Sequence, residues 1–394
     1  MTTLPTVLLR PGEADRVLAG HPWLYRNSID RISREATTGD WVQVKDHRQR
    51  FLGCGFFHAT SKIAVRVLTP ERATPDTQFF QQRIQTARDL RTRLLPNATT
   101  CRMVNSEADF LSGLIVDKYE DALVLQITSA GMDRCKPAIL SALRTLFAPV
   151  AIVERGDVAS RKFEGLPQEI SLIEGNVPQP FIANLGGLKF QMDLMGGHKT
   201  GAYLDQQHTH VQVARHCAGA RVLDCFTFQG GFAIHAAHAG AVQVHALDQS
   251  EDALTIAAAN ARHNGVESRC TFEKANIFDW LKAASPQTSQ HDVIILDPPS
   301  FTRNRASVPD ALRGYKEIHL RALRLLPPGG LLATFCCSHH VDAPLFMQVI
   351  LDAARDARRV LRLREVYSQS HDHPIIPAIP ETEYLKGFAL EIAR

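Results

Sequence analysis

Several features that would assign a function at once are absent from this sequence. No apolar stretch approaches the roughly 18 residues that a membrane-spanning helix needs, and no charged segment followed by an apolar run opens the chain. The dinucleotide fingerprint GxGxxG is missing, which weighs against an oxidoreductase. The formal net charge is only +3, so the chain is not a polycation that binds nucleic acid by charge alone. We therefore expect local binding sites and no membrane segment.

The eight cysteines also lack a recognisable pattern. None of them form a CxxC pair, and no histidine pair lies near them at the spacing of zinc ligands. We therefore expect no metal site. Free thiols are typical of a reducing compartment, which predicts a cytoplasmic protein.

The length and composition indicate several globular domains. Apolar residues make up 45% and charged residues 22% of the 394 residues, as in ordinary globular proteins. Residues 1–72 alternate short β-rich runs with turns, which predicts a small β-barrel or sandwich. This segment has 11 Lys and Arg against 7 Asp and Glu, a local excess of +4. Residues 73–187 open with an apolar stripe at helical spacing over 75–95 and mix strands with a second helix over 135–146, which predicts an α+β domain.

Residues 188–394 show the regular alternation of strands and helices that defines the α/β class. The strand candidates are 221–225, 242–247, 270–273, 293–296 and 330–336, with helices predicted over 253–263 and 321–326. Such alternation predicts a Rossmann-like, mainly parallel sheet with helices on both faces. The chain as a whole is thus predicted to be an α/β multidomain protein.

Polar residues follow these strands in an order that favours a nucleotide-like cofactor, because ligands of open parallel sheets bind at the carboxyl ends of the strands. The first strand leads into a glycine-containing loop, in which glycine permits positive φ and close approach of a ligand. Later strands end in an acceptor suited to a ribose diol, in a short polar side chain suited to an adenine amino group, and in a stiff Asp-Pro-Pro turn. The candidates are Asp224, Phe226, Thr227, Gly230 and Gly231 in the loop, followed by Asp248, Asn276 and Asp297.

The strand after Asp-Pro-Pro ends in two cysteines, Cys336 and Cys337. Successive side chains on a strand point to opposite faces, so at most one thiol faces the predicted site. A thiolate there can attack carbon 6 of a pyrimidine and activate carbon 5 for methylation. A buried thiol is more often an inert small hydrophobe, and an inert Cys337 would instead predict methylation of a nitrogen.

Long motifs along the chain resemble one family. They include Gly20-His21-Pro22-Trp23, Gly197-His198-Lys199-Thr200-Gly201, Tyr203-Leu204-Asp205-Gln206, Asp297-Pro298-Pro299, Arg313-Gly314-Tyr315-Lys316, Cys337-Ser338 and Tyr384-Leu385-Lys386-Gly387-Phe388. In these segments the chain resembles the large-subunit ribosomal RNA methyltransferases of the ribosomal large subunit methyltransferase I type.

The resemblance implies an activity, a cofactor and an architecture. It implies an RNA-binding PUA domain, a central α+β domain and a catalytic domain that uses S-adenosylmethionine to methylate carbon 5 of a cytosine in 23S rRNA. It places the nucleophile at Cys337, because Cys336 stands where relatives carry Ser, and it adds Gln206 to the cofactor site. Ser300, Asn276 and Gln207 depart from the family pattern, which leaves the target nucleotide open.

Cationic residues near these motifs are candidate RNA contacts. His21 and Arg26 lie in the PUA-like segment, Lys199 lies in the Gly-His-Lys motif, and Arg303, Arg305, Arg313 and Lys316 follow Asp-Pro-Pro on what we expect to be a loop at the active face. The expected partner is 23S rRNA or a precursor of the large subunit, and a homodimer is left open. The alternatives are methylation of a purine nitrogen in rRNA and an inactive rRNA-binding assembly factor.

Overall fold

The computed structural model describes residues 4–197, 200–284, 290–302 and 304–394. Contacts divide the chain into two compact units. The first comprises Met1–Asn184, Met192–Leu204 and His371–Thr382, and the second comprises Leu185–Gln191, Asp205–Ser370 and Glu383–Arg394. A hairpin of β12 (Phe181–Leu185) and β13 (Leu188–Met192) lies at the passage from one unit to the other along the chain. No helix in the described ranges is long and apolar enough to cross a membrane.

The N-terminal part of the first unit is a six-stranded sheet in the order β2-β6-β5-β4-β1-β3. Its core consists of alternate apolar residues, among them Val7, Leu9, Val42 and Val44, as the period of two in a strand requires. The elements are β1 (Thr6–Leu9), α1 (Asp15–Leu18), β2 (Trp23–Tyr25), β3 (Ile29–Ile32), β4 (Trp41–Lys45), β5 (Phe51–Phe57) and β6 (Ile63–Thr69).

The same unit contains a five-stranded sheet in the order β11-β10-β9-β8-β7. The long helix α2 begins after Asp76, whose side chain accepts a hydrogen bond from the Phe79 amide, and it packs against α4 and β7. The elements are α2 (Thr77–Leu94), β7 (Thr100–Asn105), β8 (Leu114–Tyr119), β9 (Ala122–Ile127), α3 (Ala130–Arg134), α4 (Lys136–Phe147), β10 (Ala151–Arg155), α5 (Ala159–Phe163) and β11 (Ile170–Gly175).

The second unit is built on a seven-stranded sheet in the order β16-β15-β14-β17-β18-β20-β19. Its first five strands are parallel and β20 is antiparallel to both of its neighbours. The strands are β14 (Arg221–Cys225), β15 (Gln243–Asp248), β16 (Cys270–Lys274), β17 (Val293–Leu296), β18 (Leu331–Cys336), β19 (Leu361–Ser368) and β20 (Lys386–Ile392).

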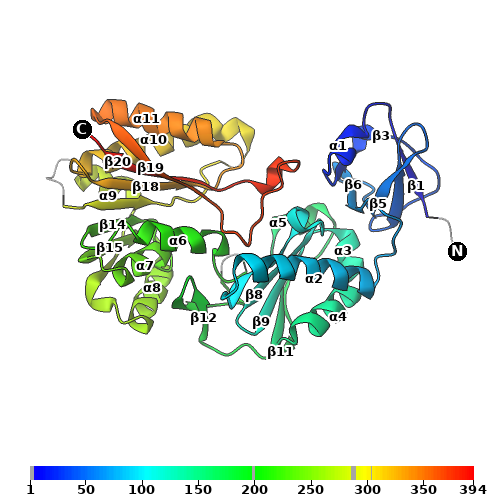
Figure 1. Ribbon diagram of the computed structural model, residues 1–394, viewed down its shortest axis with the longest axis horizontal. Coiled ribbons are helices and arrows are strands. Elements are labelled where there is room, and N and C mark those ends of the chain that lie inside the picture. The colour runs from blue at the N-terminus through cyan, green and yellow to red at the C-terminus, as the bar shows by residue number, and fades with distance from the viewer. Residues whose placement is uncertain (1–3, 198–199, 285–289, 303) are drawn as a thin grey trace. The chain divides into compact units, whose positions relative to one another are not determined.

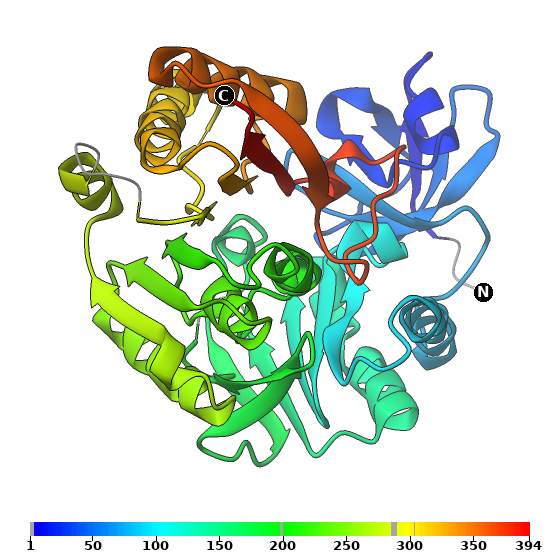
Figure 2. The same ribbon diagram turned by 60° about the vertical axis from the view of Figure 1, so that its left-hand side comes forward.

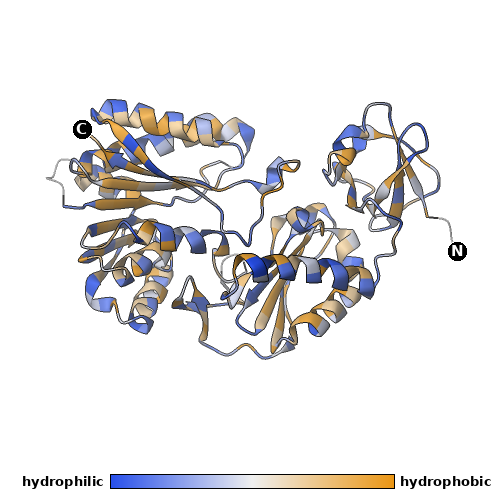
Figure 3. Ribbon diagram, in the orientation of Figure 1, coloured by the Kyte–Doolittle hydropathy of each residue, from blue (hydrophilic) through white to orange (hydrophobic). Residues whose placement is uncertain are grey.

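Two layers of helices cover this sheet, as Figures 1 and 2 show. One layer consists of α6 (Gln207–Ala214), α7 (Gly231–His238) and α8 (Glu251–His263), and the other of α9 (Ile277–Ala284), α10 (Val308–Leu325) and α11 (Ala343–Ala357). Figure 3 shows that the strands are mostly hydrophobic, whereas the helices carry both hydrophilic and hydrophobic residues. This arrangement confirms the predicted α/β multidomain class and the Rossmann-like sheet.

The prediction was wrong about the residues after Asp-Pro-Pro. Arg313 and Lys316 lie within the 18-residue helix α10, not on a loop, and the predicted helix 321–326 is only the end of that helix. Pro309 stands in the first turn, where its missing N–H costs nothing, and Ala311, Tyr315 and Ile318 are buried at helical spacing. The glycine in Arg-Gly-Tyr-Lys suggested a loop, but packing of this apolar face outweighs its low helix propensity.

Candidate active site

The carboxyl ends of five neighbouring strands bring the predicted cofactor residues to one edge of the seven-stranded sheet. Cys225 at the end of β14 pairs with Leu247 of β15 on one side and with Leu296 of β17 on the other. After β14 the chain passes to β15 and β16, whereas β17 and β18 lie on the opposite side. The order of strands therefore reverses between β14 and β17, the position where parallel sheets bind ligands.

The loop after β14 has the unusual backbone that its sequence suggested. Phe226, Phe228 and Gly230 all have positive φ, at 66°, 50° and 85°. The Thr227 amide donates to the Leu247 carbonyl at 2.9 Å, which fastens the loop to β15. A Cβ on Gly230 would lie 2.8 Å from the terminal methyl group of Ile234, which can shift, so the positive φ is the main reason that this position requires glycine.

Gly231 serves a different purpose from Gly230. It begins α7 with an ordinary φ, and a Cβ at this position would lie 2.6 Å from the ring of His210 on α6. The second glycine of the pair therefore permits α7 to pack closely on α6, whereas the first shapes the loop.

Asp224 is the buried carboxylate under this loop. Its Oδ2 accepts hydrogen bonds from Thr227 Oγ1 at 2.6 Å and from the Ala233 amide at 3.0 Å, whereas its Oδ1 has no partner among the described residues. Burial raises the pKa of Asp224 to about 7, despite these two hydrogen bonds. Asp224 thus stabilises the loop through Oδ2, and its Oδ1 remains available to accept a hydrogen bond.

Asp248 and Asn276 follow the next two strands. Asp248 accepts from the Phe228 amide at 2.8 Å with one oxygen and from the Ser250 amide at 2.9 Å with the other. Asn276 accepts from the Phe278 amide at 3.0 Å, where its side chain caps the start of α9. Both side chains therefore have fixed orientations at the strand ends.

Asp297 directly follows β17 and is held by a buried glutamine. Gln206 Nε2 donates to Asp297 Oδ1 at 3.1 Å, and Thr209 donates to the Gln206 side-chain oxygen. Next to Gln206, Asp205 accepts from the Tyr384 hydroxyl at 2.8 Å. No role was predicted for Tyr384 or Asp205, although both lie in motifs that resemble the family.

The two adjacent cysteines differ in their surroundings. Cys336, the last residue of β18, is fully buried, and its thiol donates to the Tyr315 hydroxyl at 3.4 Å. Cys337 lies just beyond the strand and is partly exposed. Because β18 pairs with β17, Cys337 and Asp297 follow neighbouring strands at the same edge of the sheet.

A buried lysine for which no role was predicted lies beside these cysteines. Lys386 at the start of β20 pairs with Cys336 across the sheet. Its Nζ donates to the carbonyl oxygens of Ser338 at 2.6 Å and Val341 at 2.7 Å. Burial lowers the pKa of Lys386, and the nearby Cys336 and Cys337 oppose this shift.

The residues at this edge fit a cofactor that carries positive charge. Three carboxylates, Asp224, Asp248 and Asp297, lie at the ends of adjacent strands, and Asp224 has a buried acceptor without a partner among the described residues. S-adenosylmethionine carries a sulfonium and an ammonium group, which such an acidic edge attracts. The open loop at Gly230 and the carboxylate of Asp248 are suited to hold its nucleoside part.

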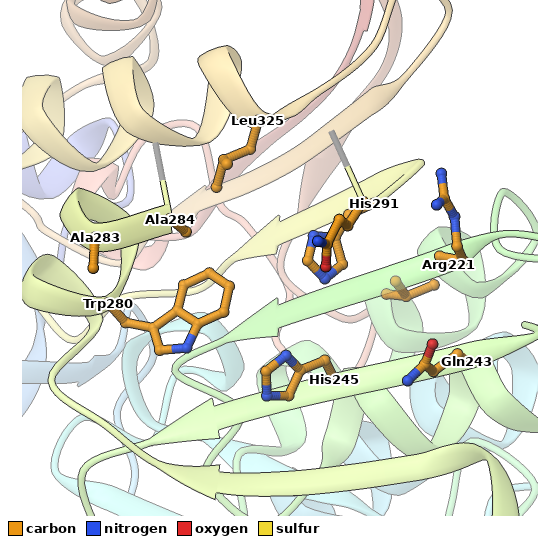
Figure 4. Close-up of a pocket in the computed structure, with 10 residues that line it drawn as sticks. Arg221, Gln243, His245, Trp280, Ala283, Ala284, His291 and Leu325 are labelled. Carbon is orange, nitrogen blue, oxygen red and sulfur yellow. The ribbon is translucent and has the colours of Figure 1, made fainter. Parts of the chain in front are cut away.

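The opposite, amino edge of the sheet contains a pocket of a different kind. The volume of this cavity is about 280 Å³. Trp280, His245 and His291 project into it from α9, β15 and the segment before β17, as Figure 4 shows. Arg221 on its rim pairs with Asp292 at 2.9 Å. The pocket lies away from the loops after the strands and contains none of the predicted site residues.

The candidate RNA contacts have dissimilar surroundings. His21 is buried and lies 3.0 Å from Glu381, and Arg26 is exposed and donates to the His58 carbonyl at 2.6 Å. Arg313 pairs with Asp310, and Lys316 pairs with Asp356 at 2.7 Å. Arg305 is exposed and pairs with no described acidic residue. Lys199 and Arg303 lie outside the described residues.

Comparisons with known proteins assign two segments of the chain to families. The model of the S-adenosylmethionine-dependent methyltransferase family matches residues 169–385, and that of the PUA-like domain matches residues 7–70. The fold and the site thus define a methyltransferase whose cofactor is S-adenosylmethionine.

Curated relatives narrow this class further. Two proteins named ribosomal RNA large subunit methyltransferase I, from Klebsiella pneumoniae and Salmonella arizonae, are 38% and 37% identical to this chain over 393 residues, which is 98% of each chain. The chain belongs to this family of methyltransferases.

Solved structures share the fold at lower sequence identity. A methyltransferase from Streptococcus mutans has a TM-score of 0.83, at 19% identity, and covers 98% of this chain and 100% of its own. A methyltransferase complexed with S-adenosylhomocysteine has a TM-score of 0.85, with the same identity and coverage. The arrangement of elements is thus retained where most residues differ.

Proposed function

We propose that this S-adenosylmethionine-dependent rRNA methyltransferase methylates carbon 5 of a cytosine in 23S rRNA, with Cys337 as the nucleophile and Asp297 as the residue that holds the base. The observation that carries the proposal is the position of Cys337. It is partly exposed beside the strand end that presents Asp297, whereas Cys336 is fully buried. Carbon 5 of cytosine requires such a nucleophile because an unactivated aromatic carbon does not accept a methyl cation equivalent.

The chemistry divides into steps that the residues of this edge can perform. The Cys337 thiolate forms a bond to carbon 6, and the electron pair of the 5,6 double bond makes carbon 5 nucleophilic. Asp297, held by Gln206, accepts a hydrogen bond from the amino group of the base with one oxygen and, when protonated on the other, donates to N3 and so helps the ring to accept electron density. S-adenosylmethionine supplies the methyl group. A base then removes the proton from carbon 5, and the C–S bond breaks to restore the double bond and release the thiolate.

The position of Cys337 directly after the fully buried strand β18 also restricts the RNA. A nucleotide must leave its helix, or be unpaired, to bring carbon 6 to Cys337. Exposed cations can hold the flanking phosphates, and Arg26 and Arg305 are the candidates that the structure describes as exposed without an acidic partner. The PUA-like domain at residues 7–70 would add a second contact with rRNA or a large-subunit precursor.

One experiment tests the proposal. The full chain is incubated with labelled cofactor and 23S rRNA that lacks its own modifications, and the methylated nucleoside is identified by mass spectrometry. We expect 5-methylcytidine from the wild type, none from Cys337→Ala, and near wild-type amounts from Cys336→Ala as the matched control. RNA that contains 5-fluorocytidine should form a covalent adduct with the wild type and with Cys336→Ala, but not with Cys337→Ala, because fluorine cannot leave as a proton does.

Two other results would overturn the proposal. A methylated purine that Cys337→Ala still produces would identify nitrogen methylation at the Asp-Pro-Pro turn. No labelling of any rRNA or precursor particle, together with retained RNA binding, would identify an assembly factor without catalytic activity.

A further inference from the structure

Lys386 is a buried cation that takes no part in the chemical steps proposed for cytosine methylation. Its side chain is enclosed in the second unit, where 8% of the residue is exposed, and burying an ammonium group is costly without compensating contacts. Two carbonyl oxygens, of Ser338 and Val341, accept its hydrogen bonds at 2.6 and 2.7 Å. Both belong to the turn that starts immediately after Cys337.

These two hydrogen bonds determine the course of that turn. The chain leaves β18 at Cys336, passes through Cys337 and Ser338, and enters α11, where the Asp342 side chain accepts from the Leu345 amide at 2.8 Å. Lys386 therefore holds both the start and the end of the turn between the strand and the helix cap. A lysine ammonium has three donors, and two of them are used here.

The other ionisable groups around this lysine come from several segments of the second unit. They are the thiols of Cys336 and Cys337, the Tyr315 hydroxyl on α10, and the carboxylates of Asp342 and Glu383. Both carboxylates are exposed, so solvent screens their charge, whereas the ammonium group is buried and acts through a medium of lower dielectric constant. Burial raises the pKa of Tyr315 above its ordinary value, which leaves its hydroxyl neutral. Lys386 therefore contributes a buried positive charge close to the Cys337 thiol.

We propose that Lys386 is a positioning residue that fixes the turn after Cys337 and places a buried positive charge beside its thiol, so that Cys337 reacts as a thiolate. A positive charge near a thiol favours its ionised form, which is the nucleophile. The role of Lys386 in catalysis rests on the proposed function, in which Cys337 is the nucleophile. The electrostatic claim itself concerns only the thiol and is measured without RNA.

The first test uses the unaltered full chain. Alkylation of each cysteine by iodoacetamide is followed against pH by peptide mass spectrometry. We expect Cys337 to react with a pH midpoint below the roughly 8.5 of an ordinary thiol. Cys135 serves as the internal reference, since it is also partly exposed and burial raises its pKa to about 11. A Cys337 midpoint at or above 8.5 overturns the proposal even if no variant can be made.

Three variants then separate charge from structure. Lys386→Gln removes the charge and should slow alkylation of Cys337 at pH 7 by about tenfold, since a tenfold change corresponds to a pKa change of one. Lys386→Arg keeps the charge and should restore most of the rate. Lys274→Gln is the matched control, because Lys274 is an exposed lysine on β16, separated from β20 by four strands, and pairs with Glu251. Equal Cys337 profiles in the wild type and Lys386→Gln would contradict the inference.

The outcome is distinguishable from failure of the proposed function. If Lys386→Gln shifts the alkylation profile but rRNA carries no 5-methylcytidine, the electrostatic role holds and the cytosine assignment fails. If 5-fluorocytidine traps Cys337 while the alkylation profile of Lys386→Gln matches the wild type, the cytosine assignment holds and the role of Lys386 fails.

Discussion

The two edges of the seven-stranded sheet present comparable sets of polar residues and use them differently. At the amino edge, Arg221 and Asp292 pair with each other, and Trp280 and the two histidines surround a cavity of about 280 Å³. At the carboxyl edge, Asp224 keeps a buried acceptor without a partner in the described chain, and Phe226 and Phe228 hold a loop at positive φ. One described cavity thus lies at the amino edge, whereas a loop with positive φ and a buried acceptor without a described partner lie at the carboxyl edge.

This difference teaches that a cavity alone is not sufficient to assign an active site. Strained backbone and unsatisfied buried groups cost free energy, and they persist where a ligand or a reaction uses them. The paired charges and packed rings at the amino edge satisfy one another, so they need no ligand to explain them. Substitutions at matched positions on the two edges can therefore break or sharpen the comparison.

The largest contrast is expected between the two aspartates that flank β17. Asp297→Ala removes the group proposed to hold the base and should lower the rate of methyl transfer by about a thousandfold, roughly 4 kcal/mol in the activation free energy. Asp292→Ala breaks an exposed pair with Arg221 at the other end of the strand and should leave the rate unchanged. Single-turnover kinetics with saturating cofactor measure both rates. Equal losses in the two variants would remove the distinction between the edges.

The second contrast concerns the pH dependence that Asp224 causes. Its pKa in the folded chain is raised to about 7, so between about pH 4 and pH 7 the folded state keeps a proton that the unfolded state has lost. The free energy of unfolding must therefore fall as the pH rises through this window. The asparagine in Asp224→Asn cannot ionise. The free energy of unfolding of this variant, relative to that of the wild type, should therefore increase by roughly 3 to 4 kcal/mol between pH 4 and pH 7.

Hydrogen exchange of the β14 amides reports the stability of this unit at each pH. The exposed Asp252 on α8 provides the control, since Asp252→Asn should show no such trend. A difference between the wild type and Asp224→Asn that does not vary with pH would contradict the buried-carboxylate interpretation.

The third contrast compares two glycines at positive φ. Gly230→Ala would strain the loop and bring its Cβ within 2.8 Å of Ile234, so cofactor affinity should fall by about thirtyfold, roughly 2 kcal/mol. Gly240 lies before β15 at the amino edge, at φ 100°, where a Cβ would meet only the Ala218 Cα at 4.0 Å. Gly240→Ala should cost stability and leave affinity for S-adenosylhomocysteine intact, as isothermal calorimetry can show. Unchanged affinity in Gly230→Ala would exclude this loop from the cofactor site.

Much of the fold could be predicted because its strands are short, apolar and regularly spaced. The bounds predicted for 221–225 and 293–296 agree with β14 and β17, since each is a buried strand bounded by polar residues. Helix α10 was missed over its first three turns because Gly314 and neighbouring cations suggested a loop. Only tertiary packing reveals that Tyr315 is buried against Phe301 and Phe346.

The site was predictable where its residues directly follow strands, as Asp248 and Asp297 do. Residues that reach the site from distant segments were not. Tyr384 contacts Asp205 across 179 positions, and Lys386 contacts Ser338 across 48. Antiparallel insertion of β20 beside β18 brings them there, and no local pattern in the sequence encodes that pairing.

The smallest expected effect on stability comes from His291 in the amino-edge pocket. His291 makes the free energy of unfolding rise with pH, whereas Asp224 makes it fall. Burial lowers the pKa of His291 to about 4, with His245 and Arg221 adding to the shift. Between about pH 4 and pH 6.5 the unfolded chain binds a proton that the folded chain does not, so stability rises with pH there and is lost as the pH falls. The ring is partly exposed, so solvent limits the effect to less than about 1 kcal/mol. His291→Asn should flatten this slope in hydrogen exchange of β17 and leave cofactor affinity unchanged. A loss of affinity in this variant would mean that the amino edge also takes part in cofactor binding.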